Sequence, residues 1–390
     1  MNGTKYSNTT KVFHWLTAFM IIAIVPLGAV GNRLPIDTDA QVVTKTLVFS
    51  MHKTLGVAVF IVALLRICYA MTQTKPAGLH PDRKTETLLA EIVHWLLYIS
   101  LVVVPLSGWI HHSASAIAAP IWIPFAGSLP FVSQNPTVAD LFGGLHWLWS
   151  KIMVAAIALH VAGALKHHFI DRDATLRRMW FGNSAPAASR SNASRIPALI
   201  ASAIFAAVAG FGAATGMLGH NKPAATNLVA VASDWTVTEG TIGITVKQLG
   251  NDVSGSFDDW VSVIAFDENA AAIAGTVQTT ISIGSLSLGT VTSQAMGNDF
   301  FDQAQFPNAV FAADLIRDGG AYVADGTLTI KGIDVPVSMP FSVTVQGNKA
   351  TMTGAVQLDR RDFAIGDSMA DEANLGFAVD VQISLQAVRE

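Results

Sequence analysis

Residues 145–169 of this chain read LHWLWSKIMVAAIALHVAGALKHHF. The stretch is almost wholly apolar, yet it carries His146 and His160, which are fourteen residues apart and so lie on nearly the same face of a helix. At about 1.5 Å of rise per residue, the two imidazoles are roughly 21 Å apart, about two-thirds of a bilayer core. Ionisable groups inside a membrane helix are costly and indicate function, and neutral imidazole is the usual protein ligand of haem iron. One helix is therefore predicted to present a haem ligand near each membrane surface.

The composition is that of a membrane protein with two unlike halves. Mean hydropathy is +0.44, and 13% of the residues are charged. All eleven histidines lie within residues 1–220, whereas residues 221–390 hold 8 Lys+Arg and 20 Asp+Glu and have none. The single Cys68 excludes an internal disulfide and a CxxCH attachment, so any haem is held without covalent bonds to the protein.

Five apolar segments are long enough to cross about 30 Å of hydrocarbon. They are residues 12–30, 47–71, 92–110, 141–170 and 196–218. Twelve Lys and Arg side chains fall on one side of these segments, and only Arg33, Lys45, Lys53 and Lys151 fall on the other. By the positive-inside rule the N-terminus is cytoplasmic, and five crossings place the C-terminal half outside.

This topology sorts the histidines by depth. His14 and His160 share the cytoplasmic half of the bilayer, and His52 and His146 share the outer half, which predicts two bis-histidine haem sites. Arg66 follows His52 by fourteen residues, so its guanidinium lies one haem layer below and can pair with haem propionates. Gly28 and Gly108 follow His14 and His94 by the same fourteen residues. They either let a porphyrin approach the backbone or serve close helix packing.

The remaining histidines leave alternatives open. His94, at cytoplasmic depth, is equally an interfacial residue, a quinone contact or a replacement ligand. His111, His112, His167 and His168 are interpreted as interfacial side chains with their rings partly in water. No catalytic residue is identified.

Four runs resemble the bacterial cytochrome b561 family: VFHWLTA, MHKTLGVAVFIVALLRI, HWLLYISLVVVPLSGW and HWLWSKIMVAAIALHVAGALKHHFIDRDATLRRM. The resemblance covers residues 5–182. It implies a four-helix bundle with two b haems bound by His14, His52, His146 and His160, which agrees with the depth argument. It also implies electron exchange with ubiquinone, and some family members oxidise superoxide at the outer face. The family is related to cytochrome b subunits of formate dehydrogenases and nickel-iron hydrogenases.

After about residue 231 the hydrophobic period changes from helical to two. The runs at 335–345 and 377–385 alternate cleanly, and about 160 residues without a disulfide predict an antiparallel sheet closed into a barrel. The segments 298–311, 326–341 and 358–366 resemble the YceI-like family, over residues 230–388. That resemblance implies a lipocalin-like barrel that binds polyisoprenoid chains, including quinone tails. Five phenylalanines are candidates for the pocket or the core: Phe257, Phe266, Phe301, Phe311 and Phe341.

We therefore expect three parts: a dihaem transmembrane domain (1–182), a linker with a fifth transmembrane helix (183–222), and a barrel domain outside the cytoplasm (223–390). The predicted protein lies in a bacterial inner membrane with its barrel in the periplasm. It transfers electrons between an outer donor, with superoxide as a candidate, and ubiquinone. Lys53 and Lys151, with Arg33 and Lys45, would provide positive charge for an anion. The expected cofactors and partners are two haems b, ubiquinone or another polyisoprenoid, and lipid; no nucleic acid is expected, and a homo-oligomer is left open.

Two alternatives remain. One is a cytochrome b subunit of a separate dehydrogenase. The other is an isoprenoid carrier whose haem bundle serves as its membrane anchor.

Overall fold

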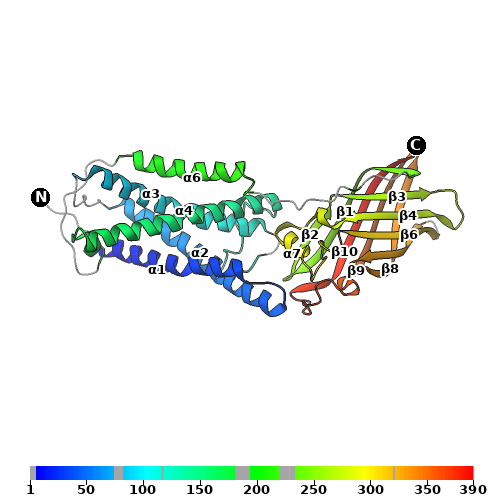
Figure 1. Cartoon of the computed structure of the whole chain (residues 1–390), viewed down its shortest axis with the longest axis horizontal. Coiled ribbons are helices and arrows are strands. Elements are labelled where there is room, and N and C mark those ends of the chain that lie inside the picture. The colour runs from blue at the N-terminus through cyan, green and yellow to red at the C-terminus, as the bar shows by residue number, and fades with distance from the viewer. Residues whose placement is uncertain are drawn as a thin grey trace. The chain divides into compact units, whose positions relative to one another are not determined.

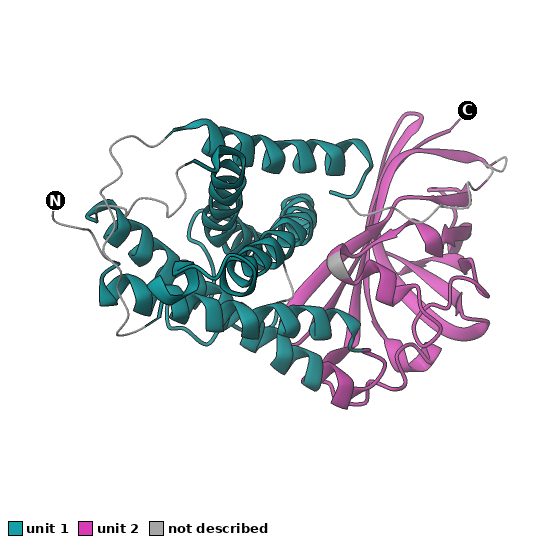
Figure 2. Ribbon diagram, turned by 60° about the vertical axis from the view of Figure 1, so that its left-hand side comes forward, with its two compact units in different colours: residues 1–34, 44–220 teal, residues 35–43, 221–390 magenta. Residues whose placement is uncertain are grey.

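The computed structural model describes residues 6–73, 82–115, 118–180, 194–218, 228, 233–318 and 321–389. The described chain divides into two compact units, residues 1–34 with 44–220 and residues 35–43 with 221–390 (Figure 2). Residues 183–193, at the start of the predicted linker, lie outside the described residues. Residues 219–231, which join the fifth helix to the sheet in the sequence, also lie outside them, except for residue 228. The three predicted domain limits stay a prediction.

Among the residues that the structure describes, five helices are long and apolar enough to span a membrane (Figure 1). They are α1 (Asn8–Arg33), α2 (Asp39–Met71), α3 (Lys84–Ala114), α4 (Pro136–Phe169) and α6 (Ile196–Ala214). The first three predicted segments lie within α1, α2 and α3, whereas the segment 141–170 ends one residue after α4 and the segment 196–218 ends four residues after α6. The first four helices begin before their predicted segments because polar turns continue the helix outside the apolar run. A four-residue helix, α5 (Thr175–Arg178), follows α4.

Local sequence signals account for the helix starts. The Ser7 side chain accepts a hydrogen bond from the Thr10 backbone N–H and caps α1. Asn135 does the same for Val138 at the start of α4, where Pro136 occupies the first turn and needs no hydrogen-bond acceptor. Such side-chain caps satisfy amide groups that the first helical turn leaves unpaired.

The fifth helix packs against α3 and α4. Ala201 is fully buried and Phe205 is 6% exposed, and they form one buried cluster with Leu96 of α3 and Ala156 of α4. A Cβ at Gly212 would lie 2.4 Å from Leu148 Cδ1, so a larger residue would have to displace the Leu148 side chain to keep this approach between α6 and α4. The opposite side of α6 is exposed and apolar, as expected for a helix that faces lipid.

The second unit is a curled antiparallel sheet of ten strands among its described residues. The strands are β1 (Trp235–Gln248), β2 (Asn251–Phe257), β3 (Trp260–Phe266), β4 (Ile273–Ser282), β5 (Leu286–Ser287), β6 (Asn308–Asp318), β7 (Ala321–Ile330), β8 (Ile333–Gln346), β9 (Lys349–Asp359) and β10 (Leu375–Arg389). Their order is β3-β4-β6-β7-β8-β9-β10-β1-β2-β5. The two runs predicted from alternation lie in β8 and β10, where buried or half-buried side chains alternate with exposed ones. The predicted all-β fold is confirmed.

Residues at and just before the start of β1 hydrogen-bond to β3, which is the strand at one end of the sheet order. The Ser233 hydroxyl accepts a hydrogen bond from the Ile264 N–H at 2.6 Å, and the Trp235 indole donates to the Phe266 carbonyl at 3.1 Å. Because β3 stands at one end of the strand order, these bonds join that edge to β1 and leave less backbone unpaired. Trp235 is 1% exposed and closes this end of the interior.

Candidate functional site

The four histidines predicted as haem ligands meet in two pairs. The ring centroids of His14 and His160 are 6.2 Å apart, and those of His52 and His146 are also 6.2 Å apart. Two imidazoles that share one metal ion need about this separation, since each metal–nitrogen bond is about 2 Å and each ring centre lies roughly 1 Å further on. The helices therefore place one pair suited to a metal at each of two depths.

The imidazoles of His52 and His146 are each held by the backbone of a neighbouring helix. His52 Nδ1 lies 3.0 Å from the Ile24 carbonyl of α1, and His146 Nδ1 lies 2.8 Å from the Val104 carbonyl of α3. A carbonyl can only accept, so Nδ1 carries the proton and Nε2 is left for a metal. Both rings are thus oriented as haem ligands require.

The two glycines singled out by spacing make room for these rings. A Cβ at Gly28 would lie 2.8 Å from the His52 ring, and one at Gly108 would lie 2.9 Å from the His146 ring. Each glycine stands four residues after the carbonyl that the histidine binds. Each glycine therefore provides close packing with an imidazole of a neighbouring helix, as one of the two alternatives predicts, and the approach of a porphyrin to the same glycines stays a prediction.

We call His14, Arg66, His94, Tyr98 and His160 the His14 layer. The ring centroid of His94 is 5.0 Å from that of His160, whereas the His14 centroid is 6.2 Å from it. The structure therefore brings together His14, His160 and His94, which the sequence left as a possible replacement ligand. His94 Nδ1 bonds to the Ala90 carbonyl of its own helix, and the side chain is exposed. The guanidinium carbon of Arg66 lies 5.8 Å from the Tyr98 ring centroid.

We call His52, Lys53, His112 and His146 the His52 layer. His112 is 8% exposed, its Nε2 lies 2.7 Å from the Gly127 carbonyl, and its Nδ1 lies 3.2 Å from Lys53 Nζ. The interpretation of His112 as an interfacial side chain was wrong, because the segment 118–135 covers it.

Neither layer includes the other three basic residues that were predicted to provide positive charge for an anion. Lys151 is exposed, with Nζ 4.9 Å from the Trp147 ring centroid, Lys45 donates to the Leu34 carbonyl, and Arg33 is exposed at the end of α1. His111 Nδ1 bonds to the Ala139 carbonyl at 2.7 Å.

A charged cluster joins the start of α3 to the end of α4. Lys166 bonds to Glu86 and, at 2.9 Å, to Asp171, and Arg83 reaches Asp171 at 3.2 Å. His167 also contacts these carboxylates, while His168 is exposed. The hydrogen bond from Lys166 lowers the pKa of the Asp171 carboxyl. These pairs satisfy one another, so the cluster is structural.

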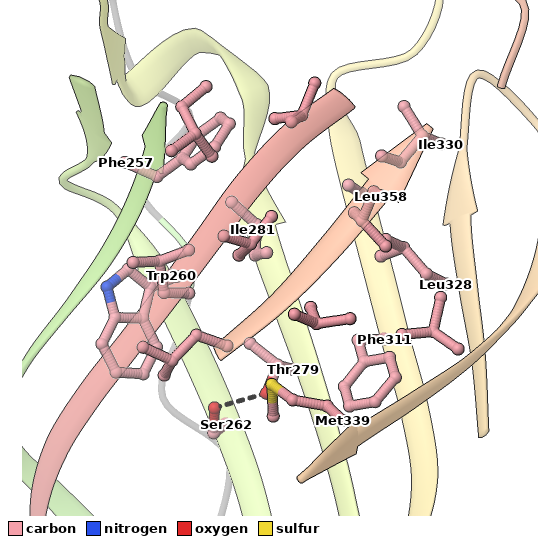
Figure 3. Close-up of a pocket in the computed structure, with 18 of the residues that line it drawn as sticks. Phe257, Trp260, Ser262, Thr279, Ile281, Phe311, Leu328, Ile330, Met339 and Leu358 are labelled. Atoms are coloured by element: carbon pink, nitrogen blue, oxygen red, sulfur yellow. Dashed lines mark hydrogen bonds between the residues drawn. The ribbon is translucent and has the colours of Figure 1, made fainter. Parts of the chain in front are cut away.

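The sheet of the second unit encloses an apolar cavity of about 250 Å³ (Figure 3). All five phenylalanines named from the sequence line it, together with Trp260, Met339 and Leu358. The Ser262 and Thr279 hydroxyls, which also line the cavity, bond to each other at 2.7 Å. Because these hydroxyls are paired, the wall presents mainly hydrocarbon and suits an apolar ligand.

One end of this cavity carries a buried cation. Arg360 is 3% exposed and donates to the carbonyls of five residues: Ile365, Gly366, Met369, Leu375 and Gly376. Burial lowers the pKa of its guanidinium. The sequence analysis missed Arg360, since its partners lie in a loop whose shape the sequence does not reveal.

Family models match both halves. One described as prokaryotic cytochrome b561 matches residues 5–182, and one described as a YceI-like domain matches residues 235–387. The chain joins a cytochrome b561 family domain to a YceI-like domain. Its first part is therefore a membrane cytochrome b561 homologue, and that family implies haem b. The imidazole pairs and their oriented Nδ1 atoms fit such a group.

Individual relatives each match one part. Cytochrome b561 homolog 1 of Escherichia coli (strain K12) is 26% identical over 176 residues, which are 45% of this chain and 96% of the relative. A Yersinia pestis protein named probable superoxide oxidase CybB is also 26% identical over 176 residues, covering 45% of this chain and 95% of the relative.

The YceI-like half has its own relatives. A UPF0312 protein of Yersinia pestis (strain Pestoides F) is 32% identical over 127 residues, 30% of this chain and 66% of the relative. The crystal structure of Burkholderia cenocepacia BcnA has 29% identity and a TM-score of 0.36, and the match covers 38% of this chain and 96% of that chain.

Proposed function

We propose that this protein is a membrane oxidoreductase that carries electrons between the two histidine layers. His52 and His146 would hold one b haem, and His14 and His160 the other, with Arg66 near its propionates. The observation that carries this proposal is the pair of equal 6.2 Å ring separations at two depths of one bundle. When bound, the haems would supply one-electron transfer along the bundle.

The proposed donor reacts on the side of the His52 layer and the acceptor is ubiquinone. Two histidines at each iron leave no coordination position open, which favours transfer without a bond between substrate and metal. Superoxide suits this constraint, because it gives up one electron to become dioxygen. Two superoxide ions and two protons balance the reduction of one ubiquinone to ubiquinol. The relative named probable superoxide oxidase supports this choice.

The proposed orientation places the His14 layer near the cytoplasm and the barrel in the periplasm. It rests on the excess of Lys and Arg beside the His14 layer and on five crossings. Reporter enzymes fused after residue 180 and after residue 389 should be active in the cytoplasm and the periplasm, respectively. The reverse pattern would invert the assignment.

The decisive test measures haem content and electron transfer in the purified full chain. We expect two haems b per chain and haem reduction within the mixing time of a stopped-flow experiment with superoxide, followed by reoxidation on addition of ubiquinone. His52→Ala or His146→Ala should remove one haem, and His14→Ala or His160→Ala the other. Haem loss with His94→Ala but not with His14→Ala would assign His94 as the ligand instead.

We also propose that the barrel binds the isoprenoid tail of a quinone or a related lipid. Each methylene buried in the apolar cavity contributes about 0.8 kcal/mol, so affinity should rise with tail length. Native mass spectrometry of the full chain with long-tailed and short-tailed ubiquinones tests this. Leu328→Arg, which places a charge in the cavity wall, should abolish the preference for the long tail.

A further inference from the structure

Lys53 stands next to the proposed ligand His52 and is held by a neutral imidazole. Because the Gly127 carbonyl can only accept, His112 Nε2 carries a proton, and His112 Nδ1 therefore accepts from the Lys53 ammonium at 3.2 Å. The ammonium is thus fixed in direction by a buried histidine, which is itself fixed by the backbone.

No acidic side chain pairs with Lys53 anywhere in the part of the chain that the structure describes. An ammonium has three N–H donors, and His112 uses one of them. The side chain is mostly buried, and a buried charge is normally balanced by an opposite charge. Within the described residues, Lys53 therefore has no carboxylate partner.

The His14 layer contains a matching arrangement. Arg66 of α2 contacts the ring of Tyr98 in α3, just as Lys53 of α2 contacts His112 in α3. The two cations are thirteen residues apart in α2, and their neutral partners are fourteen apart in α3. Each histidine layer therefore has one cation from α2 that is held by an uncharged aromatic partner from α3.

We propose that Lys53, oriented by His112, binds a carboxylate of the haem held between His52 and His146. This inference rests on the proposed function and adds a propionate partner for the second haem. A resident carboxylate is favoured over a diffusing anion because Lys53 is mostly buried and its partner His112 bonds to Gly127 of the segment 118–135. Trp122 N–H donates to the Thr54 hydroxyl at 3.0 Å, and Leu129 N–H donates to the Ser113 hydroxyl at 2.9 Å, which ties this segment to α2 and α3.

The test is an equilibrium redox titration of the full chain, with optical detection of both haems. A nearby cation stabilises the reduced state, so Lys53→Met should lower the midpoint potential of one haem and leave the other unchanged. Lys53→Arg keeps the charge and should restore the wild-type value. Lys151→Met removes the same charge from an exposed position of α4 and should change neither potential.

The positioning role of His112 is tested in the same titration. His112→Leu removes the acceptor and should lower the same potential by less than Lys53→Met does. His112→Gln, whose amide oxygen can accept from Lys53, should recover part of the shift. Two unchanged potentials in Lys53→Met would overturn the proposal. Unchanged potentials with a slower reaction with superoxide would reassign Lys53 to the substrate anion.

These outcomes are separate from failure of the proposed function. The titration uses neither superoxide nor quinone, so a chain that binds haem but does not connect these substrates still yields both potentials. A wild-type chain without haem would contradict the proposed function itself.

Discussion

The absence of one methyl group from α1 determines where the His52 ring can lie. Gly28 leaves the space that the imidazole fills, and the Ile24 carbonyl one turn earlier fixes its Nδ1. The same combination of carbonyl and glycine recurs at Val104 and Gly108 for His146. A side chain at either glycine would therefore move a proposed ligand rather than merely loosen helix packing.

We predict that Gly28→Val lowers the haem content by up to one haem per chain. The added atoms would lie well within contact distance of the His52 ring, and a well-packed site tolerates such overpacking poorly. Ala29→Val adds bulk at the next, exposed position of α1 and should keep full haem content. A haem assay per mole of protein compares the two. Equal haem loss in both variants would argue against a specific role for Gly28.

Arg360 stabilises the loop between β9 and β10 through hydrogen bonds to carbonyl groups. All five of its N–H donors have an acceptor, including the Gly376 carbonyl at 3.0 Å and the Ile365 carbonyl at 2.7 Å. The neighbouring Arg361 is exposed and pairs instead with Asp359. The two adjacent arginines thus have very different energetic roles.

Arg360→Met is predicted to destabilise this loop by about 3 kcal/mol, since several buried carbonyls would lose their donors. Hydrogen–deuterium exchange of residues 360–376 in the full chain should then accelerate by roughly a hundredfold, at about 1.4 kcal/mol per tenfold. Arg361→Met removes an exposed ion pair and should change exchange by less than threefold. If both variants exchange alike, the carbonyl bonds of Arg360 do not stabilise the loop.

At the scale of elements, α6 adds a fifth helix to a four-helix family pattern. It lies against α3 and α4 through Ala201, Phe205 and Gly212, and the Trp149 indole reaches toward the Phe205 carbonyl at 3.4 Å. Small residues let membrane helices approach closely, and van der Waals packing then stabilises them because lipid supplies no hydrophobic driving force between helices.

Gly212→Val should weaken the packing of α6 by about 1–3 kcal/mol, because the new side chain would overlap Leu148. The matched control is Gly210→Val in the same helix, where a Cβ meets no described atom within 4 Å. Limited proteolysis next to α6 and thermal loss of the haem spectrum should both distinguish the variants. Identical behaviour would mean that α6 is not held by this contact.

At the scale of the whole molecule, the helical unit and the curled sheet each have their own buried clusters. Leu96, Ala156 and Phe205 form one in the bundle, and Leu315, Met339 and Phe341 form one inside the sheet. Units with separate cores normally fold as separate domains. We therefore infer a functional reason for the fusion. The barrel, which we propose to bind a quinone tail, would exchange that quinone with the bundle.

A chain that ends after residue 218 is therefore predicted to retain both haems and their spectrum. Its turnover with superoxide and added long-tailed ubiquinone should fall relative to the full chain, because tethering a binding domain gives an effective concentration on the order of millimolar. A short-tailed quinone, which needs no carrier, should be reduced equally by both. Loss of the haem spectrum on truncation would show that the two units form one folding unit.

The sequence by itself determined the features that depend on local period and on transfer from water. These are the five apolar helices, the alternation of β8 and β10, and the positions of the histidines along the helices, which pair His52 with His146 and His14 with His160. Such features follow from the hydrophobic periodicity of the sequence and from the free-energy cost of burying polar groups. The five phenylalanines, which the sequence left as candidates for the pocket or the core, all line the cavity.

Only the tertiary structure decided the contacts between residues far apart in the chain. The carbonyls that hold His52 and His146, the burial of His112 beneath residues 118–135, and the loop around Arg360 all arise from side chains meeting distant backbone. No periodicity specifies which carbonyl a donor will reach, because that depends on how helices and loops pack. The same packing decides that the space left by Gly28 is next to the His52 ring.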